Sequence, residues 1–128
     1  MSTQQPIVLC VDDDSVFIDV IGNKLTQEGM SCVYASSGRV AFDVLAKGTR
    51  PNVILLDITM PDMDGFEVLE KLRQDNTLST VPVIIFSNDA TPENKAKAIQ
   101  LGAQAFLEKV QVTPGAVVEL IRGLPTIA

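Results

Sequence analysis

The chain is poor in the residues that most often build metal and redox sites. Its 128 residues include no histidine, no tryptophan and only two cysteines, which form no CxxC pattern. Cys10 and Cys32 both stand in apolar surroundings, so we interpret them as reduced core thiols of a cytoplasmic protein. A disulfide between them would require their two strands to be favourably apposed.

Long apolar runs and a surplus of basic residues are also missing. No stretch approaches the roughly 20 apolar residues of a membrane span. The first residues, MSTQQPIVLCVDDD, lack the basic start of a signal peptide. Ten lysines and arginines stand against sixteen aspartates and glutamates, which gives a net charge of −6. This balance disfavours nucleic acid and anionic membrane as partners, and we expect neither.

Apolar runs alternate with amphipathic segments along the chain. Its composition, 46% hydrophobic and 20% charged, is typical of a globular protein, and no repeat or linker divides it into parts. The expected strands are 7–11, 31–35, 53–56, 83–86 and 103–107, the last beginning at Ala103 or Gln104, and the expected helices are 15–28, 37–47, 65–74, one opened by Thr91-Pro92, and 114–122. Helical spacing places Phe17 and Val20 on the apolar face of the first helix and Val40 on that of the second, and Gly29, Gly48 and Gly102 stand where helix C-termini belong. This alternation predicts one α/β domain with a parallel sheet and helices on both faces.

Polar side chains follow the expected strands at the points where they end. Ligands of such sheets bind at the carboxyl ends of the strands, so these side chains should share one rim. They are Asp12, Asp13 and Asp14 after the first strand, Asp57 after the third, Ser87 after the fourth and Lys109 after the fifth.

Clustered carboxylates repel one another unless a cation neutralises them, and Mg²⁺ typically takes one or two carboxylates with waters and a phosphate. We expect Asp13 and Asp57, with a backbone carbonyl just past the strand, to form such a half-shell. Asp57 would then be a nucleophile in phosphoryl transfer, and Lys109 and Ser87 would bind the phosphoryl oxygens.

In order and spacing, these residues resemble the receiver domain of bacterial two-component response regulators, including the single-domain chemotaxis type. The resemblance covers nearly the whole chain. It implies a single receiver domain over residues 1–128 with a (βα)5 flavodoxin-like fold, a doubly wound parallel sheet of five strands in the order 2-1-3-4-5. The matching positions are the pair Asp12-Asp13, the loop from Asp57 through Met60-Pro61 to Gly65, and Ser87, Phe106 and Lys109.

The resemblance also implies a signalling function rather than an enzyme with a separate substrate. Asp57 would accept a phosphoryl group from a sensor histidine kinase or a histidine phosphotransfer protein. Such a domain catalyses only its own phosphorylation and dephosphorylation, and it exists as a monomer or a weak phosphorylation-dependent dimer.

Individual roles follow from the same resemblance. Mg²⁺ would be held by Asp12, Asp13, Asp57 and the backbone carbonyl of Thr59, with Asp12 acting through water. Ser87 and Phe106 would be the switch pair that changes a protein-binding surface for an output partner. The positions of Thr59 and Asp89 would set the rate at which the phosphoryl group is lost.

Asp14 and Val110 are not assigned roles from the resemblance. Asp14, taken alone, is best explained as the N-cap of the first helix, because acids favour helix N-termini. Val110 stands where the family usually has proline after the lysine. A cis bond before a residue other than proline costs about 2.5–4 kcal/mol, so we expect a trans bond and a re-routed loop there.

Two rival functions remain open at this stage. Asp12-Asp13-Asp14-Ser15-Val16 also fits the DxDx[TV] pattern of haloacid-dehalogenase-type phosphohydrolases, with Asp12 as nucleophile and Asp14 as acid and base. The chain is short for that fold, and the pattern leaves Asp57 unexplained. The second rival is a receiver that acts as a docking module without phosphorylation.

Overall fold

The computed structural model describes residues 5–124, in which five strands and five helices alternate strictly along the chain. The strands are β1 (Ile7–Val11), β2 (Ser31–Ala35), β3 (Val53–Asp57), β4 (Val83–Ser87) and β5 (Ala105–Glu108). The helices are α1 (Ser15–Gln27), α2 (Gly38–Ala46), α3 (Gly65–Gln74), α4 (Pro92–Gln100) and α5 (Pro114–Arg122).

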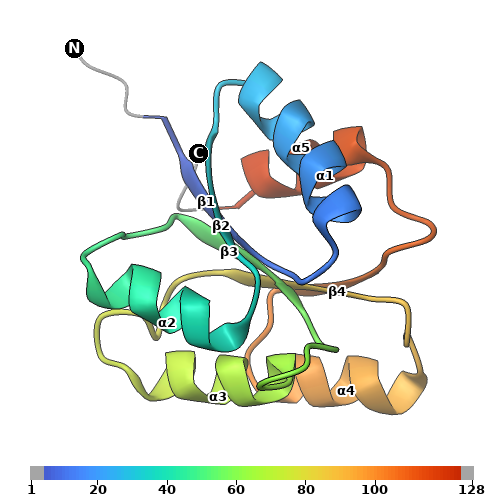
Figure 1. The fold of residues 1–128 in the computed structure, drawn as a ribbon. Coiled ribbons are helices and arrows are strands. Elements are labelled where there is room, and N and C mark those ends of the chain that lie inside the picture. The colour runs from blue at the N-terminus through green and yellow to red at the C-terminus, as the bar shows by residue number, and fades with distance from the viewer. Residues whose placement is uncertain (1–4, 125–128) are drawn as a thin grey trace.

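The strands form one parallel sheet in the order β2-β1-β3-β4-β5. Helices α1 and α5 cover one face of the sheet, and α2, α3 and α4 cover the other (Figure 1). The strand order reverses direction between β1 and β3, which is the place where open α/β sheets bind ligands. The predicted fold class and strand order are therefore confirmed.

Burial on both faces explains why the inner strands read as continuous apolar runs. Every residue of β3 and of β4 is buried, as expected for strands covered by helices on two sides. Alternate side chains of the sheet enter two hydrophobic clusters, one below α2, α3 and α4 and one below α1 and α5. The polar residues that end β3 and β4, Asp57 and Ser87, are therefore buried as well.

Helix ends follow the predicted capping residues closely. The Asp14 carboxylate accepts a hydrogen bond from the backbone N–H of Phe17 at 3.1 Å, which confirms Asp14 as the N-cap of α1. Thr91 caps α4 in the same way, and Pro92 occupies its first turn. The glycines expected at helix C-termini have positive φ, namely Gly29, Gly48 and Gly102.

The expected buried faces of two helices were wrong at single positions. Val20 on α1 and Val40 on α2 are 50% and 37% exposed, whereas both were expected to face the core. The buried residues of α1 are Ile18, Ile21, Gly22 and Leu25. Within α4 only Ala98 is buried, and Ile99 is 55% exposed, so this helix packs lightly against the sheet.

The fifth strand begins at Ala105, one or two residues later than the expected start at Ala103 or Gln104. The backbone N–H of Ala103 donates to the carbonyl of Ala98, so Ala103 still belongs to the helix-ending turn of α4. After the strand, the N–H groups of Gln111 and Val112 both donate to the carbonyl of Glu108, which forms a tight turn. All peptide bonds of residues 5–124 are trans, including Lys109–Val110, so the trans bond expected there is confirmed.

Both cysteines are free, with Cys10 buried and Cys32 half-buried, as predicted. In the described part of the chain, no helix is long and apolar enough to cross a membrane.

Candidate functional site at the carboxyl rim of the sheet

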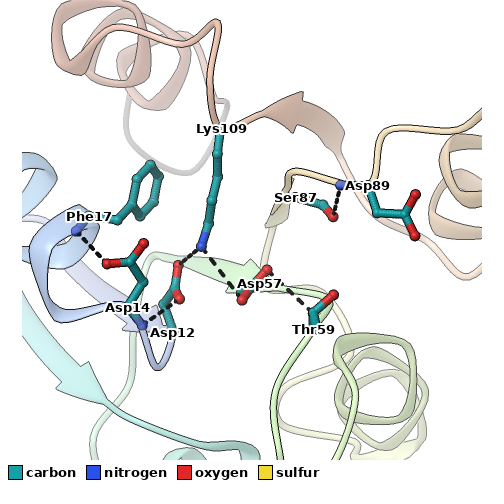
Figure 2. Close-up of polar contacts among 8 residues, drawn as sticks. All are labelled: Asp12, Asp14, Phe17, Asp57, Thr59, Ser87, Asp89 and Lys109. Carbon is teal, nitrogen blue, oxygen red and sulfur yellow. Dashed lines mark hydrogen bonds and ion pairs between the residues drawn. The ribbon is translucent and has the colours of Figure 1, made fainter.

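The polar residues expected at the strand ends do gather at one rim of the sheet. Asp12 follows β1, Asp57 ends β3, Ser87 ends β4 and Lys109 follows β5. In Figure 2 their side chains converge on one small region, with Lys109 reaching down between Asp12 and Asp57. The parallel sheet brings them together because all its strands end on the same side.

Three carboxylates form the acidic part of the site. Oxygens of Asp12, Asp13 and Asp57 lie within 4.8 Å of one another. Asp12 and Asp57 are only 4% and 5% exposed, whereas Asp13 is exposed and borders solvent. When two nearly buried carboxylates lie this close together, their repulsion raises the free energy of the state in which both are ionised. A nearby cation lowers that free energy.

Lys109 supplies one such cation. Its Nζ lies 2.7 Å from Oδ2 of Asp12 and 3.6 Å from Oδ2 of Asp57, and its side chain is 8% exposed. Burial opposes the charge on Lys109, but its hydrogen bond to Asp12 and the charges of Asp12 and Asp57 outweigh burial and raise its pKa. Lys109 is therefore an ammonium ion bound tightly to Asp12 and loosely to Asp57.

Both oxygens of Asp12 are engaged by the protein itself. Oδ1 accepts a hydrogen bond from the backbone N–H of Asp14 at 2.9 Å, while Oδ2 pairs with Lys109. By contrast, the Asp57 oxygens have only longer contacts, from the Thr59 N–H at 3.4 Å and from Lys109 at 3.6 Å. Of the two buried carboxylates, Asp57 is thus the freer to take a new partner.

The Asp57 carboxyl group is a weaker acid than an ordinary aspartate. Burial, together with the charge of Asp12, raises its pKa from 3.8 to about 6, although Lys109 and the Thr59 N–H act in the opposite direction. The carboxylate is ionised at neutral pH but poorly stabilised, which favours reaction with, or binding to, a positive group.

The fourth strand delivers Ser87 to the same rim. Its side chain is 1% exposed, and its Oγ accepts a hydrogen bond from the backbone N–H of Asp89 at 2.9 Å. Asp89 itself is exposed and, in Figure 2, points away from Asp57. Phe106 is half-buried on β5 and packs against the cluster below α2, α3 and α4.

The loop after Asp57 folds back so that the start of α3 lies against the end of β3. The N–H of Gly65 donates to the carbonyl of Ile58 at 2.7 Å. A side chain at Gly65 would collide with the backbone of Asp57 and Ile58, so glycine is required for α3 to begin this close to the acceptor strand. Thr59, within the loop, is exposed.

Sequence reasoning missed two residues that shape the site. Asp62 accepts hydrogen bonds from the N–H groups of Gly38 and Arg39, so it ties the loop to the start of α2. Phe17 lies beside Lys109, although its place in a helical repeat indicated only core packing. For Asp62 the only signal in the sequence was its position as an acid in a turn-rich loop, which is weak. For Phe17 the sequence contained no signal of its contact with Lys109.

The comparisons with known proteins agree with this geometry. The model of the response regulator receiver domain matches residues 8–122. The two-component response regulator ORR11 of Oryza sativa is 37% identical over 106 residues, which cover 81% of this chain and 71% of that protein.

Solved structures give the same result. The chemotaxis protein CheY4 of Vibrio cholerae superposes with a TM-score of 0.85 at 27% identity, covering 93% of this chain and 98% of that one. A CheY-like receiver domain protein from Methanospirillum hungatei gives 0.84 at 28% identity, covering 93% and 92%. The chain belongs to the response regulator receiver domain family, the signalling domains of two-component systems.

Proposed function

We propose that residues 1–128 form a single phosphoacceptor receiver in which Asp57 takes a phosphoryl group from a sensor histidine kinase or a histidine phosphotransfer protein. One observation supports this most strongly. Asp57 is a nearly buried carboxylate with a raised pKa, and it shares its site with two other carboxylates and an ammonium group 3.6 Å away. A nucleophile, a cation and metal-binding acids are the parts that phosphoryl transfer to an aspartate requires.

In the transfer step, an oxygen of the Asp57 carboxylate forms a bond to phosphorus while the bond from phosphorus to the donor's imidazole nitrogen breaks. The electron pair of the broken bond leaves with the imidazole, which takes up a proton and becomes neutral. Lys109 keeps Asp57 ionised for attack and then binds an oxygen of the new acyl phosphate. Ser87 donates its hydroxyl hydrogen to another of these oxygens.

The acidic residues fit a hard divalent cation such as Mg²⁺, because all their donor atoms are oxygens and one side of the cluster, at Asp13, is open to solvent. Asp13, Asp57 and the backbone carbonyl of Thr59 would hold it directly. Asp12 would act through water, since both of its oxygens already have protein partners. When bound, Mg²⁺ would neutralise charge on the carboxylates and the phosphoryl oxygens.

Phosphorylation of Asp57 would change the protein surface through movements of Ser87 and Phe106. It adds roughly −1.5 to −2 charge beside Ser87, whose oxygen now accepts the N–H of Asp89. A new bond from Ser87 to the phosphoryl group would draw the end of β4 inward. Phe106 would then move and alter the groove between α4 and α5, which is lined by Lys95, Phe106, Leu107, Glu108, Gln111, Val112 and Ala116.

This surface would bind a protein output partner more tightly in the phosphorylated state. The change is a shift between two arrangements, and its size is limited by the difference in contact energy between them. We further propose a cytoplasmic protein that is a monomer or a weak phosphorylation-dependent dimer, with neither nucleic acid nor membrane as partner. Its only catalysis would be its own phosphorylation and dephosphorylation.

Thr59 and Asp89 would govern loss of the phosphoryl group. Both are exposed beside the site, and both are small enough to leave a path for an attacking water. Asp89 either helps to hold that water or, by its charge, disfavours an approaching anion. In both cases we expect the protein to dephosphorylate itself rather than to keep a long-lived mark.

The test is phosphorylation by acetyl phosphate and Mg²⁺, followed by intact-mass measurement. Wild type should gain one phosphoryl group, and Asp57→Asn should gain none. Asp64→Asn is the matched control, because Asp64 lies in the same loop but only caps α3, a role that asparagine also fills. Modification that persists in Asp57→Asn and disappears in Asp12→Asn would contradict the proposal.

That last result would instead support the phosphohydrolase, which needs Asp12 as nucleophile and Asp14 as acid and base. The family match and two contacts disfavour it. Asp12 has both oxygens engaged, and the exposed Asp14 carboxylate caps α1. The docking module without phosphorylation predicts an unmodified wild type that still binds its partner.

A further inference from the structure

The ammonium group of Lys109 has a third neighbour besides the two carboxylates. It lies over the ring face of Phe17, with Nζ 4.7 Å from the ring centroid. Figure 2 shows the ring beside the end of the lysine side chain, on the side away from Ser87. A cation over an aromatic face is attracted by the ring quadrupole, and the attraction strengthens when the pair is shielded from water.

The ring of Phe17 is itself fixed from two directions. Its backbone N–H donates to the capping carboxylate of Asp14 at 3.1 Å, which sets the first turn of α1. Its ring meets the ring of Phe86 edge to face, with centroids 5.3 Å apart and planes at 63°. Phe86 is 1% exposed and pairs with Asp57 in the register of β3 and β4. The ring is therefore anchored on β4, the strand that pairs directly with the acceptor strand β3.

The bond to Asp12 alone does not hold the Lys109 ammonium group close to Asp57. The lysine side chain is flexible, and the turn that follows it is open, with Val110 77% exposed. The short bond to Asp12 at 2.7 Å pulls the ammonium group away from Asp57, which is 3.6 Å distant. A second attraction on another side of the ammonium group restricts its movement around Asp12.

We propose that Phe17 is a positioning residue whose ring face holds the Lys109 ammonium group between Asp12 and Asp57. This inference rests on the proposed function, since the purpose of the placement is to meet the phosphoryl group on Asp57. The phenyl ring of Phe17 has no group that takes part in phosphoryl transfer, so Phe17 acts only through Lys109.

The sharpest test changes the ring quadrupole while preserving ring shape. Phe17 is replaced by phenylalanine analogues with one, two and three fluorines, and the affinity for beryllofluoride, a phosphoryl mimic, is measured at saturating Mg²⁺. We expect a stepwise loss that reaches about 5- to 20-fold for the trifluoro ring, the range given by a shielded cation–π pair. If Phe17 only packed against its neighbours, the affinity for beryllofluoride would not fall in steps with the number of fluorines.

The chain provides a matched control. Lys97 lies over the ring of Phe66 at 4.5 Å, in a second cation–π pair that does not include Lys109. Fluorination of Phe66 should leave the beryllofluoride affinity unchanged. If the Phe17 series is flat, or if the two series fall equally, the positioning role is wrong even though wild type binds the mimic.

A second arm needs neither mimic nor metal. In the free protein, the ε-methylene protons of Lys109 should be shifted upfield by the Phe17 ring current, and Phe17→Leu should abolish the shift. Unshifted protons in wild type would overturn the positioning role by themselves. If wild type fails to bind beryllofluoride, the proposed function is wrong, and this lysine shift then decides the placement of Lys109 independently.

Discussion

Replacing Asp57 by asparagine should stabilise the metal-free protein at neutral pH. The folded-state pKa of Asp57 is raised from 3.8 to about 6, chiefly by burial and by the charge of Asp12. Between these values the folded protein retains a proton that the unfolded chain has lost, so stability falls as pH rises. Above both values, the folded state carries an unfavourable charge that asparagine lacks.

The size of the effect follows from the pKa difference. At 1.36 kcal/mol per pKa unit, the rise corresponds to at most about 3 kcal/mol. We therefore expect the difference in unfolding free energy between Asp57→Asn and wild type to grow in favour of the variant as pH rises. The increase from pH 4 to pH 7.5 should be about 1–3 kcal/mol. Other carboxyl groups titrate in both proteins, and their contributions largely cancel in the difference.

Urea unfolding in the presence of a chelator measures this difference. Far-UV circular dichroism should follow the transition, because the chain contains no tryptophan. Asp64→Asn, at an exposed carboxylate of the same loop, should match wild type across the range. A difference between Asp57→Asn and wild type that stays constant from pH 4 to 7.5 would refute the reasoning.

Adding Mg²⁺ should narrow the difference in unfolding free energy between Asp57→Asn and wild type. A cation that binds only the folded state stabilises it by mass action, and Asp57→Asn loses one of the proposed ligands. Wild type should therefore gain more stability from Mg²⁺ than the variant does. Equal gains in the two proteins would place the cation away from Asp57.

Three further predictions concern the surroundings of the site. Asp62→Ala should lower the urea concentration at the midpoint of unfolding, because the first N–H groups of α2 lose their acceptor. Thr59→Lys or Asp89→Arg should change the lifetime of the phosphorylated protein, measured by loss of the added mass; a lifetime unaltered in both would remove their role. Beryllofluoride should shift the amide resonances of residues 87–110 in wild type and less in Ser87→Ala, and no shift despite binding at Asp57 would indicate a passive phosphate carrier.

The fold and the main polar residues of the site could be predicted from the sequence, because both depend on where the strands begin and end. Buried parallel strands appear as short apolar runs, and topology then brings the residues that follow them to one rim. For this reason the sequence alone predicts that Asp12, Asp57, Ser87 and Lys109 lie together.

Side-chain contacts between elements were not predictable in the same way. Residues spaced along α1 at helical intervals gave no means of deciding that Phe17 lies beside Lys109 while Val20 faces solvent. The direct pairing of Lys109 with Asp12 depends on how β5 and β1 sit across the sheet, which no local pattern encodes. The sequence placed the start of β5 too early because an apolar residue such as Ala103 fits both a strand and the end of a helical turn. In the structure the backbone N–H of Ala103 completes the last turn of α4.

The central claim is that Asp57 itself carries the phosphoryl group, and chemical trapping of the acyl phosphate tests it most directly. After treatment with acetyl phosphate and Mg²⁺, borohydride reduces an aspartyl phosphate to the corresponding alcohol, which peptide mass spectrometry then locates. We predict homoserine at position 57 in wild type and at no other aspartate. Homoserine at position 12, or none in a protein that has gained a phosphoryl group, would contradict the account.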